Sequence, residues 1–152
     1  MAEVSTLTTG TGPADSRDTL KTGEHYLQTL DPGECLELLE PGGVGRVGFA
    51  AAEGIVMVPV NFAVAGKTII FRTAPDTLLA VYATGLVSFQ VDRVDEALRA
   101  GWSVLVHGHA HKVTDEREIK RLEAGRSLVP WAAGARDVFV RIAPTQITGR
   151  RL

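Results

Sequence analysis

The chain has 152 residues, of which 45% are hydrophobic and 22% are charged, and its formal net charge is −2. This length and composition indicate one globular domain with a sizeable core, and a net charge so close to zero excludes the strongly basic surface of a nucleic-acid-binding protein. The single cysteine, Cys35, excludes an intramolecular disulfide and therefore a disulfide-stapled secreted scaffold.

Residues 1–23 are rich in Thr, Ser, Gly and Asp and show no sustained hydrophobic period. They predict a disordered leader in front of one folded domain, residues 24–152. The leader lacks the charged start and the continuous apolar stretch of a secretory signal, and no apolar run approaches the ~20 residues of a membrane-spanning helix. We therefore expect a cytoplasmic protein that does not enter a membrane.

The run Asp31-Pro32-Gly33-Glu34 is a strong helix start. Asp31 can cap the helix, the proline suits its first position, and Glu34 completes a capping box. The apolar residues that follow predict a helix that ends at Pro41-Gly42-Gly43. Within this helix, Cys35 is interpreted as a small apolar residue.

After this helix the hydrophobic period changes from helical to alternating, which predicts strands. Glu53-Gly54 and Ala65-Gly66 are the turns of two successive hairpins. A short helix through Leu78 and Tyr82, and a charged helix from a capping box at Asp115 to about Gly125, interrupt the strands. The predicted strands contain Val47 to Ala51, Val56 to Val64, Thr68 to Thr73, Val87 to Val91, Trp102 to Val113 and Val138 to Ile142. Six strands with hairpin links, and without long parallel crossovers, indicate a barrel.

Two glycine-containing motifs resemble nucleotide sites but stand in the wrong context. Residues 43–48 match the GxGxxG fingerprint, yet a helix precedes them and a strand follows, which is the reverse of what a dinucleotide site needs. We interpret this segment as a strand in which glycines let another backbone come close. Gly66-Lys67-Thr68 resembles the end of a P-loop, but Asn61 occupies the position of the first glycine, so a hairpin is favoured.

His107, His109 and His111 alternate along one predicted strand, so their rings share a face at steps of about 7 Å. That spacing can serve a metal. No acidic or cysteine residue stands at a convincing ligand spacing nearby, so the shell is incomplete. We therefore expect the histidines on a solvated outer face, and no physiological metal.

Pro59 stands in a strand that otherwise resembles a central one, although proline has no N–H for the ladder. We expect it at an edge or a bulge, or where something other than a strand is bonded, and a flat ligand could occupy such a gap. Asn61 follows on the polar face of the same strand. On the neighbouring segment Arg72, Thr73 and Thr77, with the amides that open the next helix, predict an anion-binding seat.

Seven segments of the chain occur in an order that is typical of one protein family. They are Glu34-Cys35-Leu36-Glu37-Leu38-Leu39, Gly45-Arg46-Val47, Pro59-Val60-Asn61-Phe62, Phe71-Arg72-Thr73, Phe89-Gln90-Val91-Asp92, residues 101–108 (GWSVLVHG) and residues 140–151 (VRIAPTQITGRR). From Leu30 to Leu152 the chain thereby resembles the actinobacterial pyridoxamine 5'-phosphate oxidase-like proteins. The resemblance implies a mainly β fold, a six-stranded antiparallel Greek-key split β-barrel with short flanking helices. It also implies a homodimer with a flavin, FMN, in each groove between the subunits.

The resemblance further implies which residues meet the cofactor. The backbone of Val58, Pro59, Val60 and Asn61 borders the isoalloxazine ring, whereas Arg72, Thr73 and Thr77 approach the phosphate. The residues expected to line the groove, some of them from the partner, are Trp102, Trp131 in the Pro130-Trp131 turn, and Arg136. The alternative for Trp131 is a side chain that fills space in the core (a core plug). The alternative for Arg136 is a charged side chain exposed to solvent.

The chain departs from the family pattern at the phosphate seat. Where relatives have a Gly-Ser/Thr-Lys-Leu run, this chain has Asp76-Thr77-Leu78-Leu79. The loss of one charged contact to a phosphate costs ~1.5–3 kcal/mol, roughly ten- to a hundredfold in affinity. We therefore expect weaker FMN binding, or another ligand such as a deazaflavin.

Two classes of function fit this sequence. One is a flavin-dependent oxidoreductase acting on a small molecule, in which the cofactor performs hydride or electron transfer and no residue is identified as an acid or base. The other is a non-catalytic barrel dimer that binds a flavin or another small ligand. The presence of Asp76 and Leu78 in place of the family's glycine and lysine favours this second class.

Overall fold

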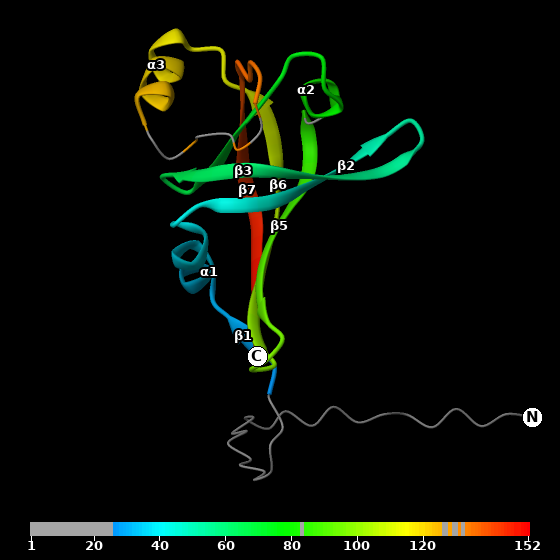
Figure 1. The fold of residues 1–152 in the computed structure, drawn as a ribbon, viewed down its shortest axis with the longest axis vertical. Coiled ribbons are helices and arrows are strands. Elements are labelled where there is room, and N and C mark those ends of the chain that lie inside the picture. The colour runs from blue at the N-terminus through cyan, green and yellow to red at the C-terminus, as the bar shows by residue number, and fades with distance from the viewer. Residues whose placement is uncertain (1–25, 83, 126–127, 129–130, 132) are drawn as a thin grey trace, which may run out of the picture.

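The computed structural model describes residues 26–82, 84–125, 128, 131 and 133–152 (Figure 1). The predicted leader, residues 1–23, lies outside the described residues. The strands are β1 (Gln28–Leu30), β2 (Gly43–Ala51), β3 (Gly54–Ala65), β4 (Thr68–Thr73), β5 (Gly85–Asp95), β6 (Ala100–Lys112) and β7 (Val138–Arg151). The helices are α1 (Pro32–Leu39), α2 (Leu78–Tyr82) and α3 (Glu116–Ala124). None of the helices in this described part of the chain is long and apolar enough to span a bilayer.

Six of the strands close into an antiparallel barrel. The sheet runs in the order β1-β7-β4-β3-β2-β5-β6, and β6 also pairs with β7, which closes the ring. The long strands β5, β6 and β7 run lengthwise, and β2 and β3 cross them (Figure 1). The predicted fold class is confirmed, with one strand more than expected, because β1 adds to β7 through pairs such as Leu30 with Gly149.

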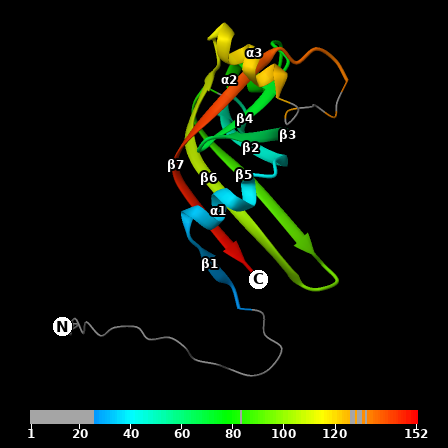
Figure 2. The ribbon, with the colours of Figure 1, turned by 90° about the vertical axis from the view of Figure 1, so that its left-hand side faces the viewer.

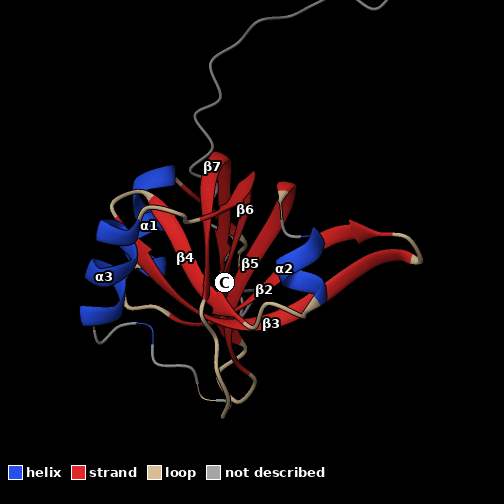
Figure 3. Cartoon of the chain, turned by 90° about the horizontal axis from the view of Figure 1, so that it is seen from above, coloured by secondary structure: helices blue, strands red, loops and turns tan. Residues whose placement is uncertain are grey.

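Two hairpins form where turn residues were predicted. β2 and β3 pair down to Ala51 opposite Gly54, and β3 and β4 meet at Ala65 opposite Thr68. At the second turn Gly66 has a φ of 64°, a left-handed conformation that glycine adopts without steric cost. The β2–β3 hairpin extends well beyond the barrel (Figure 3).

The barrel core is built from the alternating residues of the strands. Val47 of β2, Val60 and Phe62 of β3, and Phe89 of β5 are buried together. The rings of Phe62 and Phe89 meet edge to face, with centroids 4.9 Å apart. A second, smaller cluster covers the other face of β4 and β7 and comprises Ala63, Ile70, Val113, Leu128 and Phe139, with Ile119 and Leu122 of α3 packed against it.

Helix α1 begins with the predicted capping box. The Glu34 amide donates to the Asp31 carboxylate, and the Asp31 amide donates to the Glu34 carboxylate, each at 2.9 Å. The helix packs against β7 and β6 (Figure 2). Cys35 is fully buried at this contact, as its interpretation as a small apolar residue requires. Burial raises the pKa of its thiol, and the nearby carboxylates of Asp31 and Glu34 add to this rise.

Helix α3 begins and ends where predicted, but it lacks the predicted capping box. Asp115 caps it by accepting from the Arg117 amide at 3.0 Å, and Gly125 follows its last residue. The capping box expected with Glu118 does not form, because the Glu118 carboxylate pairs instead with Arg141 of β7. The ion pair between Glu118 and Arg141 thus replaces the expected contact between Glu118 and the main chain of Asp115.

The GxGxxG segment lies within β2, so the prediction of a strand is confirmed. The expected reason for its glycines is wrong at Gly45. A Cβ at Gly45 would overlap the ring of Phe89, and no backbone atom is among its nearest neighbours. Gly45 therefore makes room for an aromatic side chain of the core rather than for another backbone.

Candidate functional site

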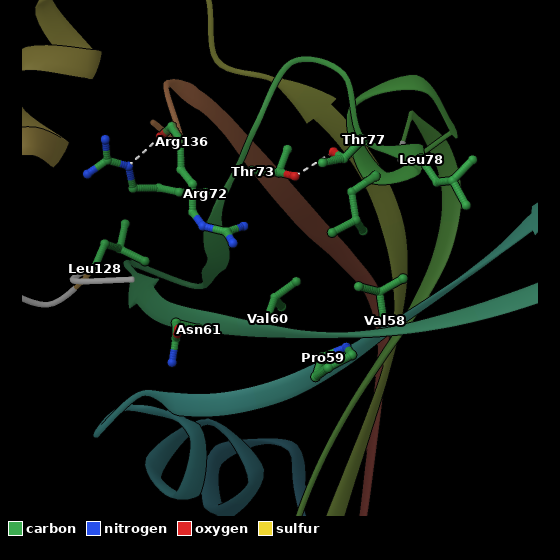
Figure 4. Close-up of a pocket in the computed structure, with 11 residues that line it drawn as sticks. Val58, Pro59, Val60, Asn61, Arg72, Thr73, Thr77, Leu78, Leu128 and Arg136 are labelled. Atoms are coloured by element: carbon green, nitrogen blue, oxygen red, sulfur yellow. Dashed lines mark hydrogen bonds between the residues drawn. The ribbon is translucent and has the colours of Figure 1, made fainter. Parts of the chain in front are cut away.

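A cavity of about 470 Å³ lies between β3, β4 and α2 (Figure 4). This volume is in the range of small-molecule sites. Eight of the ten predicted site residues line it, namely Val58, Pro59, Val60, Asn61, Arg72, Thr73, Thr77 and Arg136. Leu78, Leu79 and Leu128 complete the lining, so one cavity combines an apolar wall with two guanidinium groups.

β3 meets the cavity with an edge that has no strand beside it. β3 pairs with β2 from Gly54 to Phe62, including Pro59 opposite Arg46. On its other side β4 pairs only with residues 62–65. Residues 58–61 therefore have no strand partner on that side within the described residues. Of the alternatives expected for Pro59, the structure shows an edge, and the cavity lies along this edge.

Arg72 extends from β4, but its guanidinium turns away from Thr73 (Figure 4). Its Nε donates to the main-chain carbonyl of Arg136 at 2.8 Å. Its Cζ lies 4.7 Å from the ring centroid of Phe139, a cation–π contact with a buried ring. Arg72 is thus held by two contacts to the segment that leads into β7.

Arg136 precedes β7, and its guanidinium points into the cavity, between β3 and Thr73 (Figure 4). Its Nε is buried and has no hydrogen-bond partner among the residues that the structure describes. A buried N–H without an acceptor is unfavourable by about 1–3 kcal/mol. The arrangement therefore favours a ligand that offers an acceptor at this atom.

The two arginines of the cavity carry charge that no carboxylate balances in the described part of the chain. The ion pairs found there join Arg46 to Asp92 at 2.7 Å and Arg141 to Glu118, and both lie outside the cavity lining. A positive charge that is not balanced by a carboxylate attracts an anion. The cavity is therefore electrostatically suited to an anionic group.

Thr73 and Thr77 are joined at the α2 side of the cavity. Their hydroxyl oxygens lie 2.6 Å apart, and the Thr77 hydroxyl also donates to the Ala74 carbonyl at 2.8 Å. The Ala80 amide donates to the same Thr77 oxygen at 3.2 Å. These contacts fix the turn between β4 and α2 and place both threonines in the wall.

The two predicted tryptophans are not in the cavity wall. Trp131 is 80% exposed, so the alternative that it is a core plug is wrong. Its amide donates to the Asn61 side-chain oxygen at 3.0 Å, which ties its segment to β3. Trp102 lines a different cavity, of about 550 Å³, together with Gln90 and Asp92. Pro130 lies outside the described residues.

The structure separates the two residues that depart from the family pattern. Leu78 lines the cavity and is 50% exposed. Asp76 is exposed to solvent and is not among the lining residues. Arg136, in contrast, lines the cavity, so the alternative that it is only a solvated charge does not describe it. Of the two departures from the family pattern, only Leu78 therefore takes part in the cavity wall.

Leu79 and Leu128 line the cavity but were not among the predicted site residues. Leu79 belongs to the short helix α2, and its apolar character is the same for a core residue as for a cavity wall. Leu128 follows α3 and packs in the second cluster with Phe139. Only the tertiary structure brings it to the cavity, because no local pattern marks it.

The three histidines lie on the exposed face of β6, where they were expected. The Nδ1 atom of His107 is 3.0 Å from the Ser88 hydroxyl of β5. No group of three or more side chains suited to a metal is found among the described residues. That no physiological metal binds there stays a prediction.

Comparisons with known proteins agree with the barrel. The uncharacterized protein Rv0080 of Mycobacterium tuberculosis is 34% identical over 129 residues, which cover 81% of this chain and 84% of that protein. The FAD binding protein of Mycobacterium smegmatis has 34% identity and a TM-score of 0.65, and the match covers 84% of this chain and 99% of that chain. A FAD-binding protein of Mesorhizobium loti has 25% identity and a TM-score of 0.70, with the same coverage of 84% and 99%.

The pyridoxamine 5'-phosphate oxidase family matches residues 31–151. This span contains α1 and all six strands of the closed barrel, from β2 to β7. It also contains every residue of the cavity wall. The chain therefore belongs to the pyridoxamine 5'-phosphate oxidase family.

Proposed function

We propose that this chain is a flavin-binding oxidoreductase that acts on a small molecule, with FMN held in the cavity at the β3 edge. One observation carries the proposal: the cavity joins an apolar strand edge to two arginines without carboxylate partners in the described residues. A flavin nucleotide has the same division, with a flat ring at one end and an anionic phosphate towards the other. The FAD-binding relatives support a flavin as the ligand class.

The residues of the cavity fit such a group. The backbone of residues 58–61 would border the ring, because no strand of the described part of the chain covers that edge. Arg72 and Arg136 would face the phosphate, and the buried, unpartnered Nε of Arg136 would gain an acceptor. Leu78, Leu79 and Leu128 would exclude water from parts of the wall. The bound flavin would supply hydride or electron transfer.

The cavity offers no side chain for proton transfer. Its described lining contains no Asp, Glu, His, Cys, Lys or Tyr, and its ionisable groups are arginines, which stay protonated in proteins. Acid–base steps would therefore fall to the cofactor, the substrate or water. The same observation favours a second candidate, a barrel dimer that binds a flavin or another small ligand without turnover.

The proposal is tested by the colour of the protein and its response to a reductant. Purified protein titrated with FMN is expected to quench flavin fluorescence and, after removal of free ligand, to retain the visible absorption of oxidised flavin. Reduction of the bound flavin by NADH or NADPH without oxygen, and its recovery in air, would support the oxidoreductase. Bound flavin that no nicotinamide reduces would favour the second candidate. A protein that binds neither FMN nor FAD would contradict the flavin-dependent oxidoreductase, and it would also contradict flavin as the ligand of the second candidate.

We further propose a homodimer that completes the cofactor groove. Three exposed apolar side chains lie near one another, Ile55 (82% exposed), Met57 (55%) and Leu86 (74%), and they line a surface groove of about 470 Å³. An apolar surface of this kind is typical of an interface. Within one chain Trp102 lies outside the cavity, so its predicted role in the flavin groove would require Trp102 of the second copy.

The dimer is tested by light scattering at micromolar protein concentration, where the mass of two chains is expected. Leu86→Glu with Ile55→Glu should shift the protein to one chain, because two charges would be buried at the interface. Lys67→Glu, in the β3–β4 turn, is the matched control and should leave the mass unchanged. A wild-type protein of one chain would refute the dimer.

A further inference from the structure

His107 and Ser88 lie in the wall of the surface groove that also contains Ile55, Met57 and Leu86. We infer that a second copy of this chain docks on this groove while His107 is uncharged, and that protonation of His107 weakens the dimer as the pH falls. The inference rests on the proposed homodimer and names the side chain that controls it.

The groove is apolar and contains a single ionisable side chain. β2, β3, β5 and β6 all contribute to its wall, and its described lining has no Asp, Glu, Lys or Arg. Ile55, Met57 and Leu86 are exposed there, so a surface that covers the groove would remove apolar area from water. His107 is thus the one group in the lining whose charge depends on pH.

The same chain carries a projection that suits such a groove. The β2–β3 hairpin extends well beyond the barrel (Figure 3). Ile55, the second residue of β3 after the turn, is 82% exposed. In a dimer with two-fold symmetry each copy contributes the same surface, so the hairpin of one copy can contact the groove of the other. An apolar projection and an apolar groove on one chain therefore favour a second copy as the occupant.

His107 is held in the groove by contacts to β5 and β7. Its Nδ1 lies 3.0 Å from the Ser88 hydroxyl oxygen, and Ser88 is the residue opposite it on β5. The Thr145 hydroxyl of β7 donates to the main-chain carbonyl of His107 at 3.1 Å. The contact with Ser88 is satisfied by a neutral ring, because one of the two atoms donates and the other accepts.

The side chains beside His107 in the described part of the chain offer no carboxylate. Its neighbours across the ladder are Ser88 on β5 and Gln146 on β7, and both are uncharged. On its own strand the side chains of the same face are Leu105 and His109. His109 can itself become positive, so it would oppose rather than stabilise a charge on His107.

The ion pairs on neighbouring parts of the barrel are already balanced. Arg46 of β2 pairs with Asp92 of β5. Arg141 of β7 stands opposite His111 of β6 and pairs with Glu118 of α3. Each of these carboxylates therefore has its own guanidinium group. A protonated imidazole in the groove would have to draw on one of them or stay uncompensated.

Docking therefore favours the neutral imidazole. A charge moved from water into an apolar contact loses its solvation, and without a carboxylate it regains little. The dimer then binds fewer protons than two separate chains. Its Kd accordingly rises as the pH falls through the range in which histidines gain a proton. Two-fold symmetry places the ring of both copies in the contact, so the effect counts twice.

The test measures the dimer Kd at pH 7.5 and pH 5.5 at fixed ionic strength, by sedimentation with fluorescence detection from nanomolar to micromolar protein. The wild-type Kd is expected to rise by about 10- to 100-fold between these pH values, since two rings gain a proton. His107→Gln keeps a polar group for Ser88 but cannot be protonated. Its Kd should change by less than about threefold.

His109→Gln is the matched control. It makes the same substitution two residues along the same strand face, at an exposed position outside the groove lining, and should keep the pH dependence of the wild type. His107→Arg carries a permanent charge and should raise the Kd at pH 7.5 by at least about 100-fold. A pH dependence that survives in His107→Gln, or that is lost in His109→Gln, would overturn the inference.

The outcomes separate this inference from the dimer on which it rests. A wild-type protein of one chain at pH 7.5 would refute the dimer and the inference together. A wild-type protein of two chains with the same Kd at both pH values would refute the inference alone. Should the Kd lie below the measured range, the same comparison is made in an Ile55→Ala background, which weakens the apolar contact in every variant equally.

Discussion

Replacing Leu78 by lysine is expected to tighten FMN binding by about 10- to 100-fold, the worth of one charged contact to a phosphate. Leu78 lines the cavity beside Thr77, whose hydroxyl has no proton to offer. A lysine at this position would add three mobile donors and a positive charge on that side of the cavity. Because Leu78 is half exposed, the substitution removes little buried apolar surface and should leave the fold intact.

Two matched variants separate this contact from a general effect of charge. Val81→Lys adds the same charge to the same helix at an exposed position outside the cavity wall, and should change FMN affinity by less than about threefold. Asp76→Asn removes an exposed negative charge and should also have a small effect, because solvent screens it. Riboflavin affinity should not respond to any of the three. Equal gains from Leu78→Lys and Val81→Lys would contradict a phosphate near Leu78.

Phe89→Ala is expected to lower the free energy of unfolding by about 3–5 kcal/mol, the usual cost of removing a buried phenylalanine. Phe89 is fully buried and meets Phe62 edge to face at the centre of the barrel. Its ring occupies the space in which Gly45 has no side chain. Urea denaturation at one fixed protein concentration would measure the loss, since a dimer makes stability depend on concentration.

The contact between Gly45 and Phe89 makes a coupled prediction. Gly45→Ala alone should be unfavourable by about 1–3 kcal/mol through overpacking against the ring. Phe89→Leu shortens the side chain at that point, so the double variant should be more stable than the sum of the two single losses indicates. Leu105→Ala, on the more exposed face of the neighbouring strand β6, is the control and should cost less than about 1 kcal/mol. Additive losses would show that the two sites do not interact.

Local patterns predicted most of the barrel because each strand carries its own signal. The alternation along β3 and the turn at Gly66 can be recognised without knowledge of any distant contact. β1 was missed because its three residues are too few to show a period, and only pairing with β7 makes it a strand. The capping box at Asp115 was wrong because Glu118 pairs with Arg141, 23 residues away in the chain.

Most residues of the cavity wall were predictable from the sequence, but the directions of their side chains were not. The strand positions of Asn61 and Arg72 indicated a polar cluster beside Pro59, and the cavity lies there. The direction of the Arg72 guanidinium depends on the ring of Phe139 and on the Arg136 carbonyl, which belong to another part of the chain. The solvent exposure of Asp76 and Trp131 likewise depends on tertiary packing. Sequence patterns carry no information on such long-range contacts.

The uncovered edge of β3 has a consequence for association between molecules. A strand edge that presents free N–H and C=O groups is a template on which a strand of another chain can add, and this is a common route to aggregation. Residues 54–61 of β3 form such an edge beyond the last pair with β4. Pro59 stands in the middle of it and has no N–H to offer an incoming strand. The proline that lines the cavity also interrupts this template, so a Pro59→Val variant should aggregate more readily on heating than the wild type.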